Sequence, residues 1–551
     1  MKKYLILALS LFSLTACNND ENKANESNVV DVAKAIDFKV DFADYNESQD
    51  LDVTRANKET KLEEKTIVFD NGILAKYSLQ RDTTKQSRKA VTRVLPDDTY
   101  TMMAYDAATH AFKGAMTGTI VSGAFTSADA KKRLILNPGT YDFVLFNSKV
   151  SRSGNNLTVE RTDAADALIG RTQQIIYAYP NKQQVSFVMK HVGAKVKIKL
   201  TSYMPSTGAT SKLESINATD VPSSSVYDAS TGKWSVGTGQ AFSANITYGT
   251  PSQESNKYIT KSNEETAFMP ATDISKLKLT FTAGNIYNLN MSGATITFNP
   301  ATELKLEHNG AYILNVNLLY NFLYLMSDGT TGFLSETTFG GGTKTPIAVV
   351  VSRSNHMAIA LKDANNATLV HWSTNRNNIN TKITNTHNVS VLKDALTSNI
   401  TSGYDETYDP SYSTSIVTGD KRKGFNSDFP AFTAAVNYDP GVPYTGLKPI
   451  KWYLPSFSDW RWAYTLGGGK VSDVVTNKGY PWYGNLANLA FTQVGGKRFS
   501  FESHSSTEFK TYMTAHVAIT SAQLVFRYYD KWIANSGWAT VRPFVRYEDP
   551  D

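Results

Sequence analysis

The stretch QVSFVMKHVGAKVKIKL, from Gln184 to Leu200, shows the pattern that decides the fold. Its last seven residues alternate strictly between apolar positions and lysines, with the apolar ones at Ala194, Val196, Ile198 and Leu200. A period of two places successive side chains on opposite faces of a β-strand. We therefore expect a strand whose four apolar residues face a core while its lysines face water.

Similar short runs recur on both sides of this stretch, separated by turn residues. They include TYTMMAYDA (99–107), KRLILNPGTYDFVLFN (132–147), KLKLTFTAG (276–284) and HNGAYILNVNLLY (308–320). Asn137-Pro138-Gly139 predicts a turn between two strands, because Pro fixes φ and Gly tolerates positive φ. Strands at about 8 to 12-residue spacing with few helical periods are typical of β-sandwiches. The sequence predicts a mainly β chain with two tandem sandwich domains, at 56–200 and 201–325.

Composition limits the classes of function. The chain has 551 residues, 41% apolar and 19% charged, which suggests several separate cores. Its net charge is +6, but Lys and Arg are spread along strand-like runs, so we expect no nucleic-acid partner. None of the eight histidines forms a zinc-binding pair motif, and the GGGK run at 467–470 lacks the phosphate-loop pattern. We expect no metal site, no cofactor and no enzymatic activity.

The only cysteine lies near the start of the chain. Lys2 and Lys3 precede an apolar run at 4–14 that is too short to span a membrane, and small residues lead to Cys17. This resembles a bacterial lipobox, and the resemblance implies cleavage before Cys17, its lipidation, and anchoring in the outer membrane at the cell surface. The alternative is an ordinary signal peptide with an incidental cysteine. We expect a lipoprotein signal peptide at 1–17.

A separate acidic segment follows, at 18–55. From Asp20 to Glu64 there are thirteen Asp and Glu against six Lys and Arg, although the whole chain is basic. Within it the apolar residues of 36–42 alternate with polar ones, which predicts a single half-buried strand. A polar stretch without strong structure then follows and carries Arg55. One strand is thus predicted to be joined to the rest of the chain by a loop that a protease could cut.

Residues 1 to 325 resemble the fimbrillin family of Bacteroidales pilus subunits. The resemblance rests on the order of the lipobox, the strand at 36–42, TRAN (54–57), PGTYDFVLF (138–146) and MKHVGAKVKI (189–198). It implies two transthyretin-like β-sandwiches and assembly with other pilus subunits by donor-strand exchange. It also implies that a protease cuts after Arg55, removes the first strand, and opens a groove that another subunit's strand fills.

The composition changes after a Gly/Thr-rich stretch near Met326. Seven of the eight tryptophans lie between Trp372 and Trp538. Two helices are predicted, in SDFPAFTAAVNY (427–438), with Asp428 as the cap, and in PSFSDWRWAYTL (455–466). The second has S-x-x-D spacing typical of a capping box at its start and Gly467 as its stop.

The aromatic residues of the second predicted helix fall on different faces. Phe457, Trp460 and Tyr464 share one side, and Trp462 lies on another. We therefore expect Trp460 in a core and Trp462 facing outward.

Residues 326–551 resemble the C-type-lectin-like domains at the C-termini of many Bacteroidetes surface proteins. FPAFTAAVNY, WYLPSFSDW, SSTE (505–508) and VRPF (541–544) carry the resemblance, which implies an α+β fold. The sequence departs from the family where His504 stands in place of an expected tryptophan, and it lacks the calcium motifs. Calcium-dependent sugar binding is therefore not supported.

Aromatic side chains are the candidates for ligand contact, because flat indole and phenol rings bind the apolar faces of sugars. YPWYGN (480–485) and FRYYDKWIANSGW (526–538) have that composition, and we single out Trp482, Tyr483 and Trp532 as ligand-binding candidates. The alternative is that these rings fill a core. We expect that role for Trp452 and Trp460.

Together these features predict a pilus tip adhesin. A C-terminal domain of over 200 residues leaves a subunit that could accept a strand but hardly donate one, and that could present a surface to a glycan or protein receptor. One alternative is an anchor or minor subunit that keeps its lipid. Another is a surface lipoprotein outside a pilus that binds or processes carbohydrate.

Overall fold

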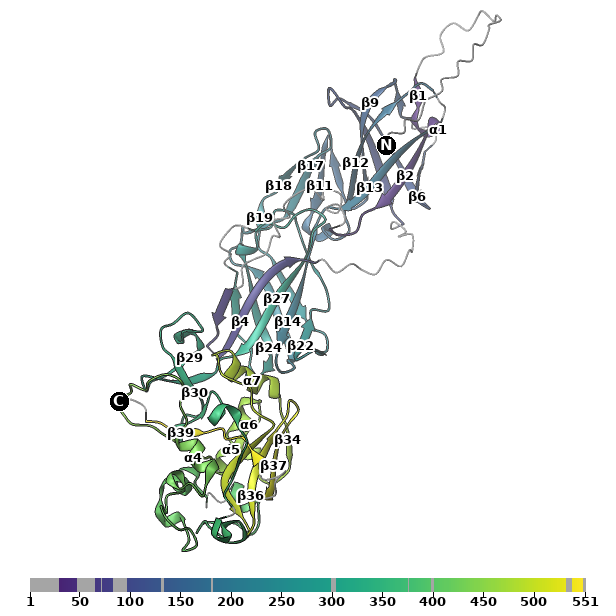
Figure 1. The fold of residues 1–551 in the computed structure, drawn as a ribbon. Helices are drawn as coiled ribbons and strands as arrows, with labels where there is room; N and C mark the ends of the chain where they lie inside the picture. The colour runs from purple at the N-terminus through teal and green to yellow at the C-terminus, as the bar shows by residue number, and fades with distance from the viewer. Residues whose placement is uncertain are drawn as a thin grey trace, which may run out of the picture. The chain divides into compact units, whose positions relative to one another are not determined.

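The computed structural model describes residues 29–46, 65–70, 72–82, 97–129, 133–179, 182–298, 304–374, 376–397, 401–531 and 538–548. The chain forms two compact units, each drawn from separate segments (Figure 1). The first unit comes from Met1–Asp50, Lys85–Val192 and Ser224–Gly237, and the second comes from Leu51–Thr84, Gly193–Ser223 and Thr238–Asp551. Strands predominate in both, which confirms the predicted mainly β fold.

Seven strands of the first unit close into a barrel-like sandwich. In spatial order they are β12 (Leu168–Ile176), β13 (Gln183–His191), β2 (Ile36–Phe42), β7 (Ala124–Ser127), β6 (Phe112–Val121), β5 (Thr99–Asp106) and β9 (Gly139–Asn147). The predicted turn at 137–139 joins β8 (Ile135–Leu136) to β9. Aromatic rings such as Phe38, Phe143 and Phe187 fill the interior.

Smaller elements surround this barrel. β1 (Val30–Asp31) pairs with β8, and α1 (Val32–Ala35) leads into β2. A four-stranded sheet has the order β10 (Ser151–Ser153), β11 (Asn156–Glu160), β17 (Ser224–Asp228) and β18 (Lys233–Val236).

Two sheets form a sandwich in the second unit. The larger has the order β21 (Ser252–Glu254), β22 (Lys257–Lys261), β14 (Ala194–Ser202), β27 (Ala311–Tyr320), β4 (Ile73–Arg81) and β3 (Lys65–Val68), with β23 (Thr266–Phe268) also on β14. The smaller has the order β20 (Ser243–Thr247), β15 (Thr207–Ser215), β24 (Leu277–Ile286) and β25 (Leu289–Asn290), with β26 (Thr295–Thr297) on β24. A separate pair joins β16 (Val221–Pro222) to β19 (Gly239–Gln240). In β14 the apolar residues are buried and the lysines only partly so, as its alternation predicts.

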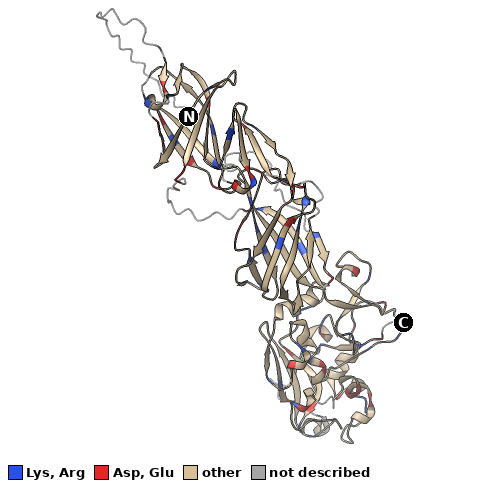
Figure 2. Ribbon diagram, turned by 180° about the vertical axis from the view of Figure 1, so that it is seen from behind, with Lys and Arg blue, Asp and Glu red and all other residues tan. Residues whose placement is uncertain are grey.

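The strands of the two sandwiches do not follow the boundary expected at residues 200 and 201. β3 and β4 belong to the second sandwich, because β4 pairs along its whole length with β27. β14 joins the same sheet, while Ser224–Gly237 belongs to the first unit. Alternating hydrophobicity identifies a strand but does not predict which strand it pairs with. The partner of β4 lies more than two hundred residues away in the sequence. Figure 2 shows that Lys and Arg are distributed along the strands of both units.

The C-terminal region combines two sheets with short helices. One sheet has the order β29 (Thr331–Phe333), β28 (Leu323–Met326), β30 (Pro346–Ser352), β31 (Met357–Ala360), β39 (Phe544–Arg546) and β33 (Lys451–Tyr453). The other has the order β34 (Gly479–Pro481), β37 (Gln523–Asp530), β36 (Met513–Ile519) and β35 (Glu502–Phe509), and β32 (Val370–His371) pairs with β38 (Trp538–Ala539). The α-helices are α2 (Asp394–Thr397), α3 (Gly403–Tyr408), α4 (Pro430–Val436), α5 (Phe457–Trp460), α6 (Ala463–Leu466) and α7 (Gly484–Thr492).

Short stretches of 3-10 helix complete the described elements of both units. They are η2 (Arg161–Asp163), η3 (Ile274–Lys276), η4 (Leu334–Glu336), η5 (Ala364–Ala367), η6 (Arg376–Thr381), η7 (Pro410–Tyr412), η8 (Lys423–Phe425) and η9 (Val471–Asp473).

The predicted helix starts are partly right. Ser456 and Asp459 form the expected capping box of α5, and Gly467 caps the end of α6, although the single predicted helix is two short ones. The cap predicted at Asp428 is wrong, because α4 begins one residue later with Phe429 at the N-cap position. The Asp428 carboxylate instead accepts a hydrogen bond from the Thr374 hydroxyl at 3.1 Å.

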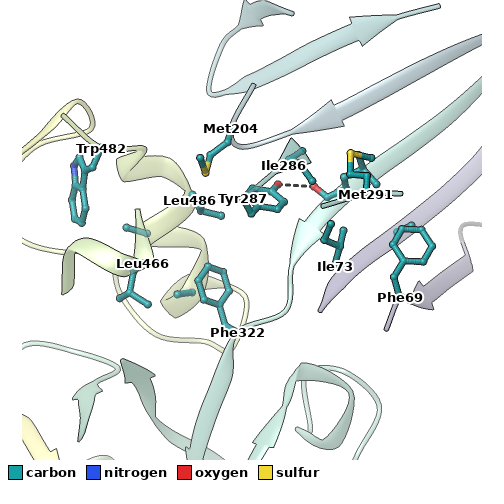
Figure 3. Packing of buried hydrophobic residues seen from close by; sticks show 14 of the residues in the cluster. Phe69, Ile73, Met204, Ile286, Tyr287, Met291, Phe322, Leu466, Trp482 and Leu486 are labelled. Carbon is teal, nitrogen blue, oxygen red and sulfur yellow. Dashed lines mark hydrogen bonds between the residues drawn. The ribbon is translucent and has the colours of Figure 1, made fainter. Parts of the chain in front are cut away.

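The second sandwich and the C-terminal region share one hydrophobic core. Met204 and Tyr287 of the sandwich belong to the same buried cluster as Leu466, Trp482 and Leu486 of the C-terminal region (Figure 3). Only two residues, Asn321 and Phe322, separate β27 from β28. The boundary expected at residues 325 and 326 therefore passes through a continuous core.

A hydrogen bond crosses the same junction, from the Asn288 side-chain amide of the sandwich to the Gly468 carbonyl of the C-terminal region, at 2.8 Å. Just after the link, the Tyr324 hydroxyl on β28 donates to the Ala490 carbonyl of α7 at 2.8 Å, inside the shared core. Polar contacts of this kind fix how packed surfaces align.

Candidate functional site

The first long strand, β2, lies in a slot between β13 and β7 of the first unit. Its pairing with these two neighbours differs greatly in extent. Along β13 it runs parallel, with seven consecutive residue pairs from Ile36 with Gln183 to Phe42 with Met189. Along β7 it makes one antiparallel bridge, at Lys39 and Ala124. β2 is therefore anchored mainly along one edge.

The side chains of β2 alternate between the core and water, as its sequence predicts. Ile36, Phe38 and Val40 are buried, and the polar residues between them are exposed. Phe38 is 4% exposed and its ring lies 5.9 Å from that of Phe143 and 6.1 Å from that of Phe187. Burying three such side chains contributes up to about 5–9 kcal/mol. The strand is thus a major part of the core of this unit.

Contacts on either side of β2 fix its ends. Before it, Arg133 forms an ion pair with Asp31 of β1, at 2.5 Å. After it, the ring of Tyr45 stacks on His191 of β13, with centroids 4.1 Å apart, and Phe42 meets the same imidazole edge-on. His191 therefore has a packing role.

Three of the predicted site residues lie outside the described residues. They are Cys17, the lipidation candidate, Arg55, the processing candidate, and Trp532, one of the ligand candidates. Their roles stay predictions.

The structure gives the other two ligand candidates packing contacts. Trp482 is 6% exposed, and its indole N–H donates to the Thr520 carbonyl at 2.8 Å. Tyr483 is half-buried at the N-cap of α7, and its ring meets that of Tyr258 edge-on at 5.8 Å. Tyr483 keeps part of its surface in water while the faces of Trp482 are covered. Their ligand-binding role stays a prediction.

The tryptophans expected in the core are there. Trp460 is fully buried and donates from its indole to the His504 carbonyl at 3.1 Å, and Trp452 packs against Tyr438. Trp462, which was expected to face outward, is half-buried and packs against the shared core. The aromatic residues of 451–462 therefore hold this region together.

A buried ionic network that the sequence gave no sign of lies in the same region. The Glu508 carboxylate on β35 is fully buried and accepts hydrogen bonds from the backbone N–H groups of Thr384, at 2.8 and 2.9 Å, and of Asn385, at 2.6 Å. Lys531, also fully buried, forms an ion pair with it. These contacts attach the long segment before α2 to the second sheet. Three separate chain segments, 384–385, Glu508 and Lys531, meet at this network, so no local sequence motif predicts it.

Two further buried groups near this network, Glu406 and Lys423, have shifted pKa values. Burial raises the pKa of Glu406 in α3 to about 8, and burial lowers the pKa of Lys423 in η8 to about 8 although Glu406 attracts its charge. Both side chains are enclosed by protein. Neither side chain is exposed, so both take part in the packing of this region.

The strand at the end of the described chain is also built into the region. β39 pairs with β31 on one edge and with β33 on the other, and Phe544 and Val545 are fully buried. Among the described residues, no cluster of His, Cys, Asp and Glu side chains is suited to holding a metal ion. No helix in those segments is long and apolar enough to cross a membrane.

Residues 44–321, about half of the chain, match the family model described as fimbrillin-like. The chain belongs to the fimbrillin-like family. Family membership confirms the resemblance to fimbrillins, and it makes the protein a pilus or adhesion subunit of the cell surface that associates with other pilus subunits. The match ends at the last residues of the second sandwich. It does not extend to the C-terminal region.

Solved structures similar to this fimbrillin-like chain come from Bacteroides. A fimbrial protein from Bacteroides ovatus is 11% identical, with 94% of this chain and 100% of that chain covered and a TM-score of 0.21. A candidate cell adhesion protein from Bacteroides uniformis is 16% identical, with 40% and 86% covered and a TM-score of 0.29. Such low scores support no argument beyond the family match. No curated protein matches the chain.

Proposed function

We propose that this fimbrillin-like protein is made as a lipoprotein precursor, anchored at the outer membrane through Cys17, and becomes the tip subunit of a pilus. In this proposal a protease cuts after Arg55 and releases the N-terminal segment together with β2. A strand of the next subunit then fills the slot. The observation that carries the proposal is the position of β2, a separate strand inserted in the core of the first unit.

The contacts of β2 suit an exchangeable strand. Its departure would leave the ladder edge of β13 without partners and uncover the apolar side chains that pack on Phe38. Exposed backbone groups beside an apolar trough recruit an extended peptide, because its backbone supplies the hydrogen bonds and its alternate side chains refill the pockets. A donated strand with apolar residues at every second position would restore the same core.

The tip position is supported by the C-terminal region. β39 is paired on both edges and fully buried at Phe544 and Val545, so it cannot leave as a donor strand without breaking a sheet of this region. We propose that this region has the C-type-lectin-like fold suggested by its sequence and acts as the adhesive domain toward a glycan or protein receptor. The burial of Trp452 and Trp460, which lie in the motif, suits a motif that marks a fold rather than a ligand site.

N-terminal sequencing of the protein in purified pili tests the processing step. We expect the assembled chain to start at Ala56. An Arg55→Ala variant should keep the acylated segment and fail to enter pili, while a Lys58→Ala control should assemble normally. A retained acylated Cys17 in assembled pili would instead identify an anchor subunit.

Immunogold labelling tests the tip position separately. Antibodies against residues 326–551 should label pilus ends. Labelling along the whole shaft would refute the tip role, even if processing at Arg55 were confirmed.

A further inference from the structure

A cleft lies where the second sandwich meets α7, within the second unit. Its volume is about 160 Å³. One wall comes from Tyr203, which follows β14, and from Asn256 and Lys257 at the start of β22. The opposite wall comes from α7 and from Arg498 in the segment after it. Figure 1 shows α7 next to the sandwich.

The cleft has two cations, Lys257 and Arg498, and Glu254, opposite Lys257 in the β21–β22 ladder, lines no part of it. Among the described residues neither Lys257 nor Arg498 forms an ion pair, and both are exposed. The Lys257 ammonium lies 5.4 Å from the centre of the Tyr203 ring. Burial raises the pKa of Tyr203, with Arg498 opposing that effect, so the phenol stays neutral between the two cations. The cleft is therefore electropositive and suited to an anionic group.

One face of α7 supplies amide groups to the same cleft. Asn485, Asn488 and Thr492 follow one another at three- and four-residue spacing, so they lie on one side of the helix. The Asn488 side-chain oxygen accepts a hydrogen bond from the Phe499 backbone N–H at 3.0 Å, which fixes the orientation of this amide. Amides beside an aromatic ring can bind the hydroxyls and the apolar face of a sugar, because they donate and accept at short range.

The surrounding contacts make the cleft a built site rather than a chance gap. The Tyr203 backbone N–H donates to the Tyr287 hydroxyl at 3.0 Å, and Tyr287 is a buried member of the shared core. Tyr258, next to Lys257, packs on Tyr483 at the N-cap of α7. Both walls are thus fixed to each other.

We propose that this cleft binds a saccharide unit that carries a carboxylate, such as a uronic acid at the end of a glycan. Lys257 and Arg498 bind the carboxylate, and Asn485 and Asn488 bind ring hydroxyls beside Tyr203. Its volume is well below the roughly 300 Å³ of pockets for larger ligands, so it accommodates about one pyranose ring. This inference deepens the adhesive role proposed above and rests on it for its biological meaning, but not for its test.

Calorimetric titration of the purified full chain with glucuronic acid and with glucose tests the carboxylate requirement. We expect glucuronic acid to bind at least about tenfold more tightly than glucose, because an ionised partner strengthens a hydrogen bond. Equal affinity for the two sugars, or no binding of glucuronic acid at high millimolar concentration, would overturn the proposal. Inorganic sulfate as a competitor checks the sugar requirement. Sulfate that binds as tightly as glucuronic acid would overturn the proposal, because the cleft would then bind any anion.

Matched variants locate the binding. Arg498→Gln and Lys257→Gln should each weaken binding of glucuronic acid by about tenfold. Arg353→Gln is the control, because Arg353 is also exposed, makes no ion pair among the described residues and lies outside the cleft. Unchanged affinity in both cleft variants would refute the site. Because the chain needs no processing or assembly for this titration, its result is independent of the sequencing and labelling of pili.

Discussion

Replacing Tyr324 by Phe removes a single oxygen from the hydrophobic core that the second sandwich and the C-terminal region share. That hydroxyl donates to the Ala490 carbonyl at 2.8 Å and accepts from the Gln493 side-chain amide at 2.6 Å. The carbonyl lies in the last turn of α7, where a helix supplies no partner of its own. Because Tyr324 and Ala490 are fully buried, water cannot replace the lost bond.

The cost follows from leaving a buried acceptor without a partner. Such a group costs about 1–3 kcal/mol, whereas the half-buried Gln493 can turn to water. We therefore expect Tyr324→Phe to lower the free energy of unfolding of the second unit by about 2 kcal/mol. In a unit of this size that corresponds to a fall in Tm of roughly 2–3 °C. Tyr512→Phe is the matched control, because Tyr512 is exposed, and it should change stability by less than about 0.5 kcal/mol.

Two probes report on the two sides of the junction. Tryptophan fluorescence follows the C-terminal region within this unit, since its tryptophans all lie between 372 and 538. Amide hydrogen exchange at buried positions such as Ile198 and Val316 follows the sandwich. If the shared core unfolds as one, both probes should record the same loss of free energy. A shift in fluorescence with no change in sandwich exchange would refute the shared core.

Three further substitutions test other parts of the structure. Phe38→Ala should destabilise the first unit by about 3–5 kcal/mol, seen in urea unfolding, while the exposed neighbour Asp37→Ala should have little effect. Glu406 has a pKa raised to about 8 from an ordinary 4.5, so the cost of burying its carboxyl grows as pH rises from about 4.5 to 8. Glu406→Gln should therefore lose less Tm than the wild type between pH 5 and 8, and an identical pH dependence in the two proteins would contradict the assignment. Gly403→Ala would place a Cβ 2.4 Å from the Ser456 backbone nitrogen, and this overlap should lower the Tm. A Tm equal to that of the wild type would contradict this expectation.

Local patterns predicted local structure well. The lysines of β14 and the alternation of β2 identified both strands and their buried faces, because burial on a strand follows a period of two. The capping box at Ser456 was also predicted, since a cap involves residues only three apart. The cap at Asp428 failed because Phe429 holds the N-cap position, and the Asp428 carboxylate bonds a distant residue, Thr374, instead. Tertiary contacts decide such positions, and no local window contains them.

Features made by distant segments could not be predicted. β4 joins the second sandwich through β27, and the pairing of Ile73 with Tyr320 has no signal in either stretch. The cleft likewise combines residues near 203, 257 and 485–498, none of which is unusual alone. Tyr483, predicted to bind a ligand because it lies in an aromatic-rich stretch, packs on Tyr258, the neighbour of Lys257 in the cleft. The sequence did not predict the cations that give the cleft its charge.

The two-residue link from β27 to β28 determines how the protein carries tension. A pull on the C-terminal region passes through Asn321 and Phe322 directly into β27, which has seven residue pairs with β14 on one edge and nine with β4 on the other. Ladder hydrogen bonds lie across the strand axis, so a pull along β27 loads both ladders in shear, and their bonds must break together rather than one by one. The strand that joins the region to the sandwich is therefore also its mechanical clamp, positioned to hold under the drag that a surface-bound filament bears.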